Sequence, residues 1–249
     1  GAWRIGGLPL RAMDSDEDEQ PVDPATLEPS GALESHYWAA VYEGDTELIG
    51  QFLLGNDDTD PEPGFTLDLV DARGLPTFHR LAVIGLQTAM RFLLEAAGAN
   101  VNQREPTYGQ TALHMAATKG HVDVVEMLLQ CGADPFAADT AGGWTPLHAA
   151  ARAGQDDVVS VLLASAPPEL VNVRARSLDT ALHSAAYWGR VSTVRLLMQH
   201  GADRFMLNAD GHDAVGVACK GPTANMGGLA TIRSELLLTR PSASAASAS

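Results

Sequence analysis

Short segments with apolar residues at helical spacing recur in pairs along this chain. The second member of the clearest pair places these residues on one helical face: Val124, Val125, Leu128 and Leu129. Asp123 and Glu126 fall on the opposite face. The first member spans only about two turns, and isolated helices need about 12–15 residues to be stable. Packing between neighbouring pairs must therefore stabilise both.

The first member of the pair belongs to a motif that occurs three times, at 109–120, 143–154 and 178–189. Each copy contains a histidine at the same place, and His114, His148 and His183 are separated by 34 and 35 residues. Periods of this size are typical of stacked repeats rather than of one globular core. The pattern predicts a solenoid whose function resides on its surface.

Local chemistry accounts for the helix boundaries in each copy. Thr145 suits the N-cap, where its hydroxyl satisfies a free backbone N–H, and Pro146 suits the first helical position. Gly154 ends the helix because it accepts a left-handed conformation. Gly-Ala-Asp at 132–134 and at 201–203 ends the second helix of its pair.

Degenerate copies extend the pattern in both directions. We predict an acidic, disordered tail at 1–30, a repeat domain at 31–240 and a disordered Ser/Ala tail at 241–249. The repeat domain divides into an N-terminal cap at about 33–55, an acidic insertion at 56–66, repeats at about 72–104, 107–139, 141–174 and 176–208, and a C-terminal cap at about 209–240. Because Ala175 and Leu178 replace the usual loop Asp and Gly, we expect a misshapen hairpin there.

Several motif elements recur together at fixed offsets: Thr-Pro-Leu-His, Ala-Ala-x-x-Gly, Val-Val-x-x-Leu-Leu and Gly-Ala-Asp. Over roughly residues 33–240 the chain resembles the ankyrin-repeat family. The resemblance implies an all-α solenoid of helix-turn-helix units with projecting β-hairpin loops and a concave groove. Because family members usually bind other proteins, it also implies a protein partner.

Composition narrows the classes of ligand and location. The net charge of -15, from 16 basic and 31 acidic residues, argues against nucleic acid as a ligand. No apolar run approaches the ~20 residues of a membrane span, and the first residues do not resemble a signal peptide. Two cysteines, Cys131 and Cys219, on distant repeats fit a reducing compartment. We expect a monomer without membrane insertion in the cytoplasm, and the nucleus is equally compatible.

The recurring histidines do not suggest catalysis. His79, His114, His148 and His183 would lie about 10 Å from one another in stacked repeats. One metal ion with bonds near 2.1 Å therefore could not bind two of them. The resemblance implies instead that these side chains bond to loop backbone. Since no nucleophile–base pair or phosphate loop is present either, we expect no enzyme activity, cofactor or metal.

The resemblance implies that the residue after the loop Gly and the two residues before the helix-ending Gly face the groove. Aromatic and arginine side chains, which dominate binding hot spots, occupy such positions in the later repeats or lie beside them. The predicted protein-binding residues are Tyr108, Trp144, Arg152, Tyr187 and Trp188. The alternative is that Trp188 packs on the neighbouring helix and Trp144 shields its loop.

Two residues are candidate modification sites. Ser15 lies in the acidic run at 14–19, a context that acidophilic kinases favour. Asn102 lies where some ankyrin proteins are hydroxylated, although an Asn there, as at Asn172, more often closes the hairpin. The acidic run itself is more simply a solvated spacer.

The sequence therefore predicts a non-catalytic adaptor or scaffold that binds a protein partner through its groove and hairpin tips. One alternative is a regulatory or targeting fragment of a larger enzyme or channel. Another is an acidic chaperone for basic proteins, acting through residues 14–28.

Overall fold

The computed structural model describes residues 4–5, 8–9, 32–54, 68–222 and 228–238. Its helices follow one another in pairs: α1 (Ala32–Glu43) and α2 (Thr46–Leu54), α3 (Thr77–Ile84) and α4 (Gln87–Glu95), α5 (Ala112–Lys119) and α6 (Val122–Gln130), α7 (Pro146–Ala153) and α8 (Asp156–Ser165), α9 (Ala181–Tyr187) and α10 (Val191–Gln199), α11 (Ala214–Ala218) and α12 (Gly228–Leu238). A 3-10 helix, η3 (Pro168–Asn172), follows α8. Two short strands, β1 (Arg4–Ile5) and β2 (Leu8–Pro9), pair in antiparallel fashion.

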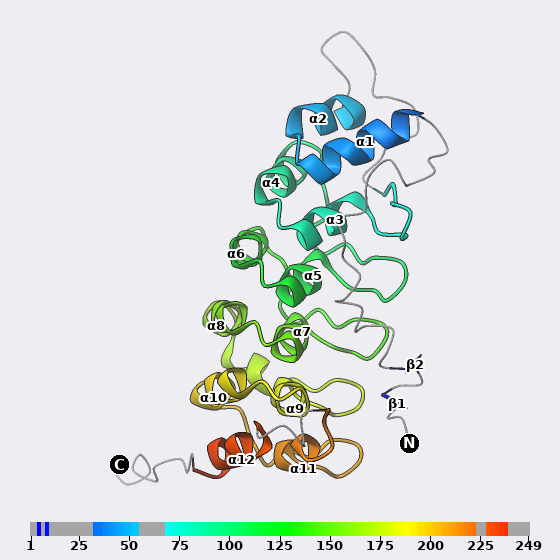
Figure 1. Ribbon diagram of the computed structural model, residues 1–249. Coiled ribbons are helices and arrows are strands. Elements are labelled where there is room, and N and C mark those ends of the chain that lie inside the picture. Colours follow the sequence, from blue (N-terminus) through cyan, green and yellow to red (C-terminus); the bar gives the residue numbers. More distant parts are fainter. Residues whose placement is uncertain (1–3, 6–7, 10–31, 55–67, 223–227, 239–249) are drawn as a thin grey trace.

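The pairs stack into two rows of helices (Figure 1). We call the odd-numbered helices α1 to α11 the inner helices and the even-numbered helices α2 to α12 the outer helices. Each helix packs on the next helix of its own row and on its partner in the other row. The loops that connect consecutive pairs project beyond the inner row (Figure 1). The predicted all-α solenoid with projecting loops is confirmed.

Threonine, histidine and glycine define the inner helices as the sequence predicts. Thr111, Thr145 and Thr180 are N-caps in extended conformation, and each forms a reciprocal capping box with the histidine three residues later. Gly154 ends α7 with φ 81°. The positive φ favours glycine at this position, and a Cβ there would also displace the Arg190 side chain, whose Cδ would lie 2.8 Å away.

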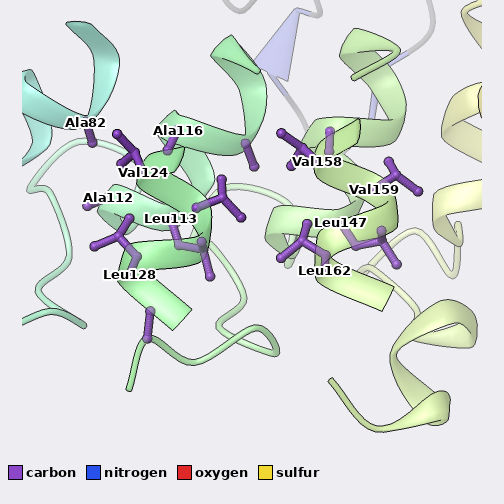
Figure 2. Packing of buried hydrophobic residues seen from close by; sticks show 14 of the residues in the cluster. Ala82, Ala112, Leu113, Ala116, Val124, Leu128, Leu147, Val158, Val159 and Leu162 are labelled. Carbon is purple, nitrogen blue, oxygen red and sulfur yellow. The ribbon is translucent and has the colours of Figure 1, made fainter. Parts of the chain in front are cut away.

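Columns of identical side chains form the core. Leu113, Leu147 and Leu182 of the inner helices are fully buried, as are the outer-helix residues Leu128, Leu162 and Leu197. Figure 2 shows the layer between α5 with α6 and α7 with α8, where leucine and valine side chains interdigitate. Burying each such side chain contributes about 1.5–3 kcal/mol. Stacking therefore supplies the stability that these short helices lack in isolation.

Some sequence predictions fall on parts of the chain that are not described. The acidic insertion at 56–66 and the tail at 241–249 lie outside the described residues. So does the predicted tail at 1–30, except for β1 and β2, which the sequence interpretation did not anticipate.

The hairpin at residues 175–179 is regular, so the expected distortion is wrong. The Ala175 N–H donates to the Asp179 carbonyl at 2.8 Å, and the Leu178 N–H donates to the Ala175 carbonyl at 2.9 Å. Leu178 adopts φ 61°, close to the φ of Gly109, Gly143 and Gly211 in the other hairpins. The turn is kept because a leucine accepts the strained left-handed conformation.

Candidate functional site

The tips of the projecting hairpins form a continuous wall. Backbone hydrogen bonds connect the last four tips in order: Thr140 N–H to Tyr108 O at 2.8 Å, Arg176 N–H to Gly142 O at 2.9 Å, and Ala209 N–H to Ser177 O at 2.8 Å. Because both partners are backbone atoms, these connections do not depend on the side chains that the tips present. We call this surface the hairpin wall.

Buried polar side chains close most of these hairpins from within. Asp71, Glu105, Asp139 and Asn208 occupy equivalent positions, and each accepts at least two backbone N–H groups of its own turn. Ala175 cannot do this. In its hairpin, the Asp179 carboxylate instead accepts from the Asn208 amide at 2.9 Å and from the Ser177 hydroxyl at 2.6 Å.

The four recurring histidines connect each inner helix to the next hairpin. Nε2 of His79, His114, His148 and His183 lies 2.9–3.2 Å from the carbonyl oxygen of Gln103, Trp144, Asp179 and His212, respectively. In the last three histidines Nδ1 accepts the backbone N–H of the N-cap threonine, so Nε2 carries the proton and donates. The predicted structural role of these residues is confirmed.

His79 differs because its repeat reverses the Thr-Pro order. Pro76 is the N-cap and has no N–H to offer, and His79 Nδ1 is buried with no hydrogen-bond partner among the described residues. Thr77 instead bonds to the Tyr37 hydroxyl of α1 at 2.7 Å. Burial raises the pKa of Tyr37 to about 12, so this phenol stays neutral and connects the N-terminal cap to the first repeat.

Burial of the four histidines determines their protonation state. Burial lowers the pKa of His148 to about 4 and lowers the pKa of His79, His114 and His183. All four are therefore neutral near pH 7. Apart from His79 Nδ1, their ring nitrogens bond to backbone atoms or to capping threonines. Among the described residues, no group of His, Cys, Asp or Glu could hold a metal ion.

A second set of contacts joins the C-terminal ends of the inner helices. The side chain after the helix-ending glycine reaches back to the preceding repeat: His121 Nε2 to Val83 O at 2.8 Å, Gln155 Nε2 to Thr118 O at 3.2 Å, and Arg190 Nε to Arg152 O at 3.1 Å. We call the surface formed by these helix ends and reaching side chains the helix-end edge. Each of these side chains directly follows a helix-ending glycine, so the spacing of the glycines marks this edge in the sequence, but the residue type varies from repeat to repeat.

The predicted binding residues fall into two groups rather than one cluster. Tyr108 and Trp144 belong to the hairpin wall, whereas Arg152, Tyr187 and Trp188 belong to the helix-end edge. Trp144 precedes α7 and Arg152 lies in its last turn, so about 12 Å of helix separates them. The two groups bound one inner-helix surface from opposite sides.

The aromatic side chains in both groups are half-buried. The Trp144 indole lies edge-on to His148, with ring centroids 5.5 Å apart, and a Cβ at Gly142 would collide with it. Part of this ring therefore shields its own hairpin, as the alternative interpretation holds. Tyr187 and Trp188 pack edge-on, with ring centroids 5.5 Å apart. All three residues remain partly exposed to solvent.

The two candidate modification residues differ in what the structure describes. The Asn102 side chain bridges to the next repeat, accepting the Asp134 N–H at 2.8 Å and donating to the Gly132 carbonyl at 3.2 Å. Asn172 makes the same bridge to Asp203 and Gly201. Ser15 lies outside the described residues. Modification of Asn102 or Ser15 stays a prediction.

The sequence interpretation placed Lys119 at a groove-facing position without including it among the predicted binding residues, and it missed two further basic residues of the helix-end edge, Arg190 and Lys220. The sequence could have drawn attention to the two lysines, because Lys119 and Lys220 are the only lysines of the chain.

Within the described residues we find no helix with the length and apolar character needed to cross a membrane.

The amino-acid sequence matches a known protein family over most of the stacked helices. A family model described as ankyrin repeats (3 copies) matches residues 37–139 and 135–208, which together cover more than half of the chain. The chain belongs to the ankyrin-repeat family. Ankyrin repeats are generally protein–protein interaction modules, and their proteins are generally non-catalytic interaction or regulatory proteins.

The chain is also similar to individual ankyrin-repeat proteins. It is 35% identical over 186 residues to an ankyrin repeat-containing protein of Treponema pallidum, covering 75% of this chain and 47% of that protein. It is 30% identical over 102 residues to protein phosphatase 1 regulatory subunit 27 of Mus musculus, covering 41% of this chain and 60% of that protein. It is 31% identical over 166 residues to ankyrin repeat and SOCS box protein 3 of Bos taurus, covering 66% of this chain and 30% of that protein. This ankyrin-repeat chain thus spans about half or less of two of these relatives.

Proposed function

We propose that this chain is a non-catalytic adaptor or scaffold that binds a protein partner through the inner-helix surface between the hairpin wall and the helix-end edge. The observation that carries the proposal is that half-buried aromatic side chains lie on both borders of a surface fixed by backbone hydrogen bonds. A preorganised surface loses little conformational entropy on association, so a few aromatic anchors suffice for useful affinity.

Two features support a regulatory or targeting role as part of a larger assembly. The chain spans 47% of one relative and 30% of another, and a third relative is a phosphatase regulatory subunit. Under this second proposal the same surface holds a partner on behalf of a catalytic subunit or domain elsewhere.

The location and oligomeric state belong to the same proposal. Cys131 and Cys219 are free and exposed, as in a reducing compartment such as the cytoplasm or nucleus. The two rows of helices bury their apolar columns within one chain, which favours a monomer.

Crosslinking capture of partners from native lysate tests the proposal. Since the predicted residues form two groups, Trp144→Ala and the double variant Tyr187→Ala/Trp188→Ala are compared separately with the unchanged chain. Phe205→Ala is the matched control, because Phe205 is 70% exposed and lies in the turn after the outer helix α10. Circular dichroism confirms that each variant is folded.

We expect each groove variant to lose at least tenfold of a specific partner's recovery, since truncating an interface anchor removes about 2 kcal/mol or more. Recovery by Phe205→Ala stays unchanged. Equal recovery by all folded variants contradicts the assigned surface.

A further inference from the structure

The helix-end edge gathers basic residues in a chain that has few. Lys119 ends α5, Arg152 lies in the last turn of α7, Arg190 follows α9, and Lys220 follows α11. The whole chain has 16 basic residues against 31 acidic ones. Both of its lysines and two of its arginines thus lie at or just beyond the C-terminal ends of four successive inner helices, although not at equivalent positions.

Contacts between repeats make these residues neighbours. Gln155 reaches the Thr118 carbonyl beside Lys119, and Arg190 reaches the Arg152 carbonyl. A Cβ at Gly221 would collide with the Tyr187 carbonyl, which places the Lys220–Gly221 segment against the end of α9. The basic residues therefore form one row along the stack, parallel to the order α5, α7, α9 and α11 in Figure 1.

Acidic residues beside this row become fewer toward its C-terminal half. Asp123 lies in the first turn of α6, and Asp156 and Asp157 lie in the first turn of α8. Asp156 accepts the Thr193 hydroxyl at 2.5 Å, so its carboxylate is directed along the outer row. The first turn of α10 has no acidic residue. The first turn of α10, which follows Arg190, therefore adds no negative charge to the row.

Tyr187 and Trp188 supply an apolar surface within the same row. Their rings lie edge-on, with centroids 5.5 Å apart, and both side chains are half-buried. Aromatic rings flanked by arginines are suited to an apolar side chain that has carboxylates on either side of it.

We propose that the helix-end edge binds an acidic peptide segment of a partner protein. Carboxylates of the segment pair with Arg152, Arg190 and Lys220, and an apolar side chain between them packs on Tyr187 and Trp188. Neighbouring repeats lie about 10 Å apart, and an extended chain advances about 3.3 Å per residue, so acidic residues recur about every third position of the segment. This inference rests on the proposed protein-binding function and specifies its partner.

A peptide fits the row better than a nucleic acid does. The row offers only four basic side chains, whereas the affinity for a long polyphosphate depends on many neutralised phosphates. The chain's own acidic run at 14–19 contains no apolar side chain to match the two aromatic rings. We therefore assign the row to a segment of another protein.

Selection of a displayed library of random 12-residue peptides on the full chain tests this assignment. We expect selected peptides to carry Asp or Glu at spacings of about three residues around one aromatic or aliphatic residue. A selected peptide is then synthesised with a fluorescent label, and its affinity is measured by anisotropy. Raising the salt from 50 to 500 mM weakens its binding several-fold, because exposed charges are screened.

Charge variants locate the peptide. Arg152→Ala/Arg190→Ala/Lys220→Ala weakens binding about tenfold, since exposed ion pairs contribute about 0.2–1 kcal/mol each. The matched control Arg91→Ala/Arg195→Ala/Arg233→Ala removes the same charge from outer helices and leaves the affinity unchanged. Circular dichroism checks the folding of both variants.

Four results would overturn the assignment. They are selected peptides without acidic enrichment, equal losses in the two charge variants, equally tight binding of a 12-nucleotide oligothymidylate, and acidic enrichment only after the carboxylates at Asp14, Asp16, Glu17, Asp18 and Glu19 are changed to amides. The last result would make the chain's own segment the occupant. If partner capture still depends on Tyr187 and Trp188 in any of these cases, the proposed function stands and only the acidic-peptide inference fails.

Discussion

His148 illustrates how one side chain connects two repeats and makes stability depend on pH. Its Nδ1 accepts the Thr145 N–H, its Nε2 donates to the Asp179 carbonyl, and burial lowers its pKa to about 4. An unfolded histidine has a pKa of about 6.5. The unfolded state therefore binds the proton more readily, so stability is fully present above pH 6.5 and is lost as the pH falls toward 4.

We predict that the titration of His148 alone lowers the free energy of unfolding by about 2 kcal/mol when the pH falls from 7.5 to 5. His148→Gln removes the titration, so its free energy of unfolding in urea falls less over this range than that of the unchanged chain. His200→Gln, which removes an imidazole at an exposed position, serves as the control. An unaltered slope in His148→Gln would contradict the assigned pKa.

Leu178 is the residue at which a sequence-based expectation failed. The pattern correctly identified a missing glycine, but the neighbouring backbone bonds of the hairpin wall hold the turn in place. Leu178 therefore adopts the left-handed conformation, which costs about 1–2 kcal/mol for a non-glycine residue, and the shape of the turn is unchanged.

Leu178→Gly should consequently stabilise the protein by about 0.5–1 kcal/mol, because relief of strain exceeds the added freedom of the unfolded chain. Leu207→Gly is the comparison, since Leu207 is also exposed and has no positive φ. It should lower stability. Urea unfolding followed by circular dichroism distinguishes the two, and destabilisation by Leu178→Gly would exclude strain at this position.

Among the secondary-structure elements, the turns after the outer helices are not equivalent. Asn102 and Asn172 bridge to the turn of the next repeat, whereas Phe136 and Phe205 occupy the same position in the alternate repeats. Phenylalanine cannot make this bridge. Between α6 and α8, where the bridge is lacking, lies an open cavity of about 470 Å³ whose lining includes Leu129.

Asn102→Ala should destabilise the chain by about 1 kcal/mol or more and accelerate hydrogen exchange at the Asp134 amide, which loses its acceptor. Asn172→Ala should instead accelerate exchange at Asp203. Exchange measured by NMR on both variants tests this reciprocity. If the Asp134 amide were equally protected in Asn102→Ala, the bridge would have no energetic role.

The elements were more predictable than the contacts between them. Thr145, Pro146 and Gly154 determine α7 by local chemistry, which a single sequence displays directly. The hydrogen bond from Arg190 Nε to the Arg152 carbonyl joins residues that are 38 positions apart in the sequence, and nothing in the sequence near either residue indicates it. For the same reason the sequence identified Trp144, Arg152 and Tyr187 as surface candidates but did not show that α7 separates the first from the others.

At the scale of the whole molecule, stability and recognition depend on different atoms. Each repeat packs mainly on its neighbours, so stability is approximately a sum over repeats and junctions. The apolar columns and the histidine contacts supply that sum. The charged and aromatic side chains at the borders of the inner surface contribute less to it and are available for recognition.

The backbone hydrogen bonds of the hairpin wall have an evolutionary consequence. Because Thr140 to Tyr108 and Arg176 to Gly142 are joined through main-chain atoms, a mutation that exchanges a tip side chain leaves the joint intact. Duplication or recombination of whole repeats likewise regenerates the same joint at the new boundary. Proteins built from such repeats can acquire a new binding partner in evolution by changing exposed side chains, without passing through poorly folded variants.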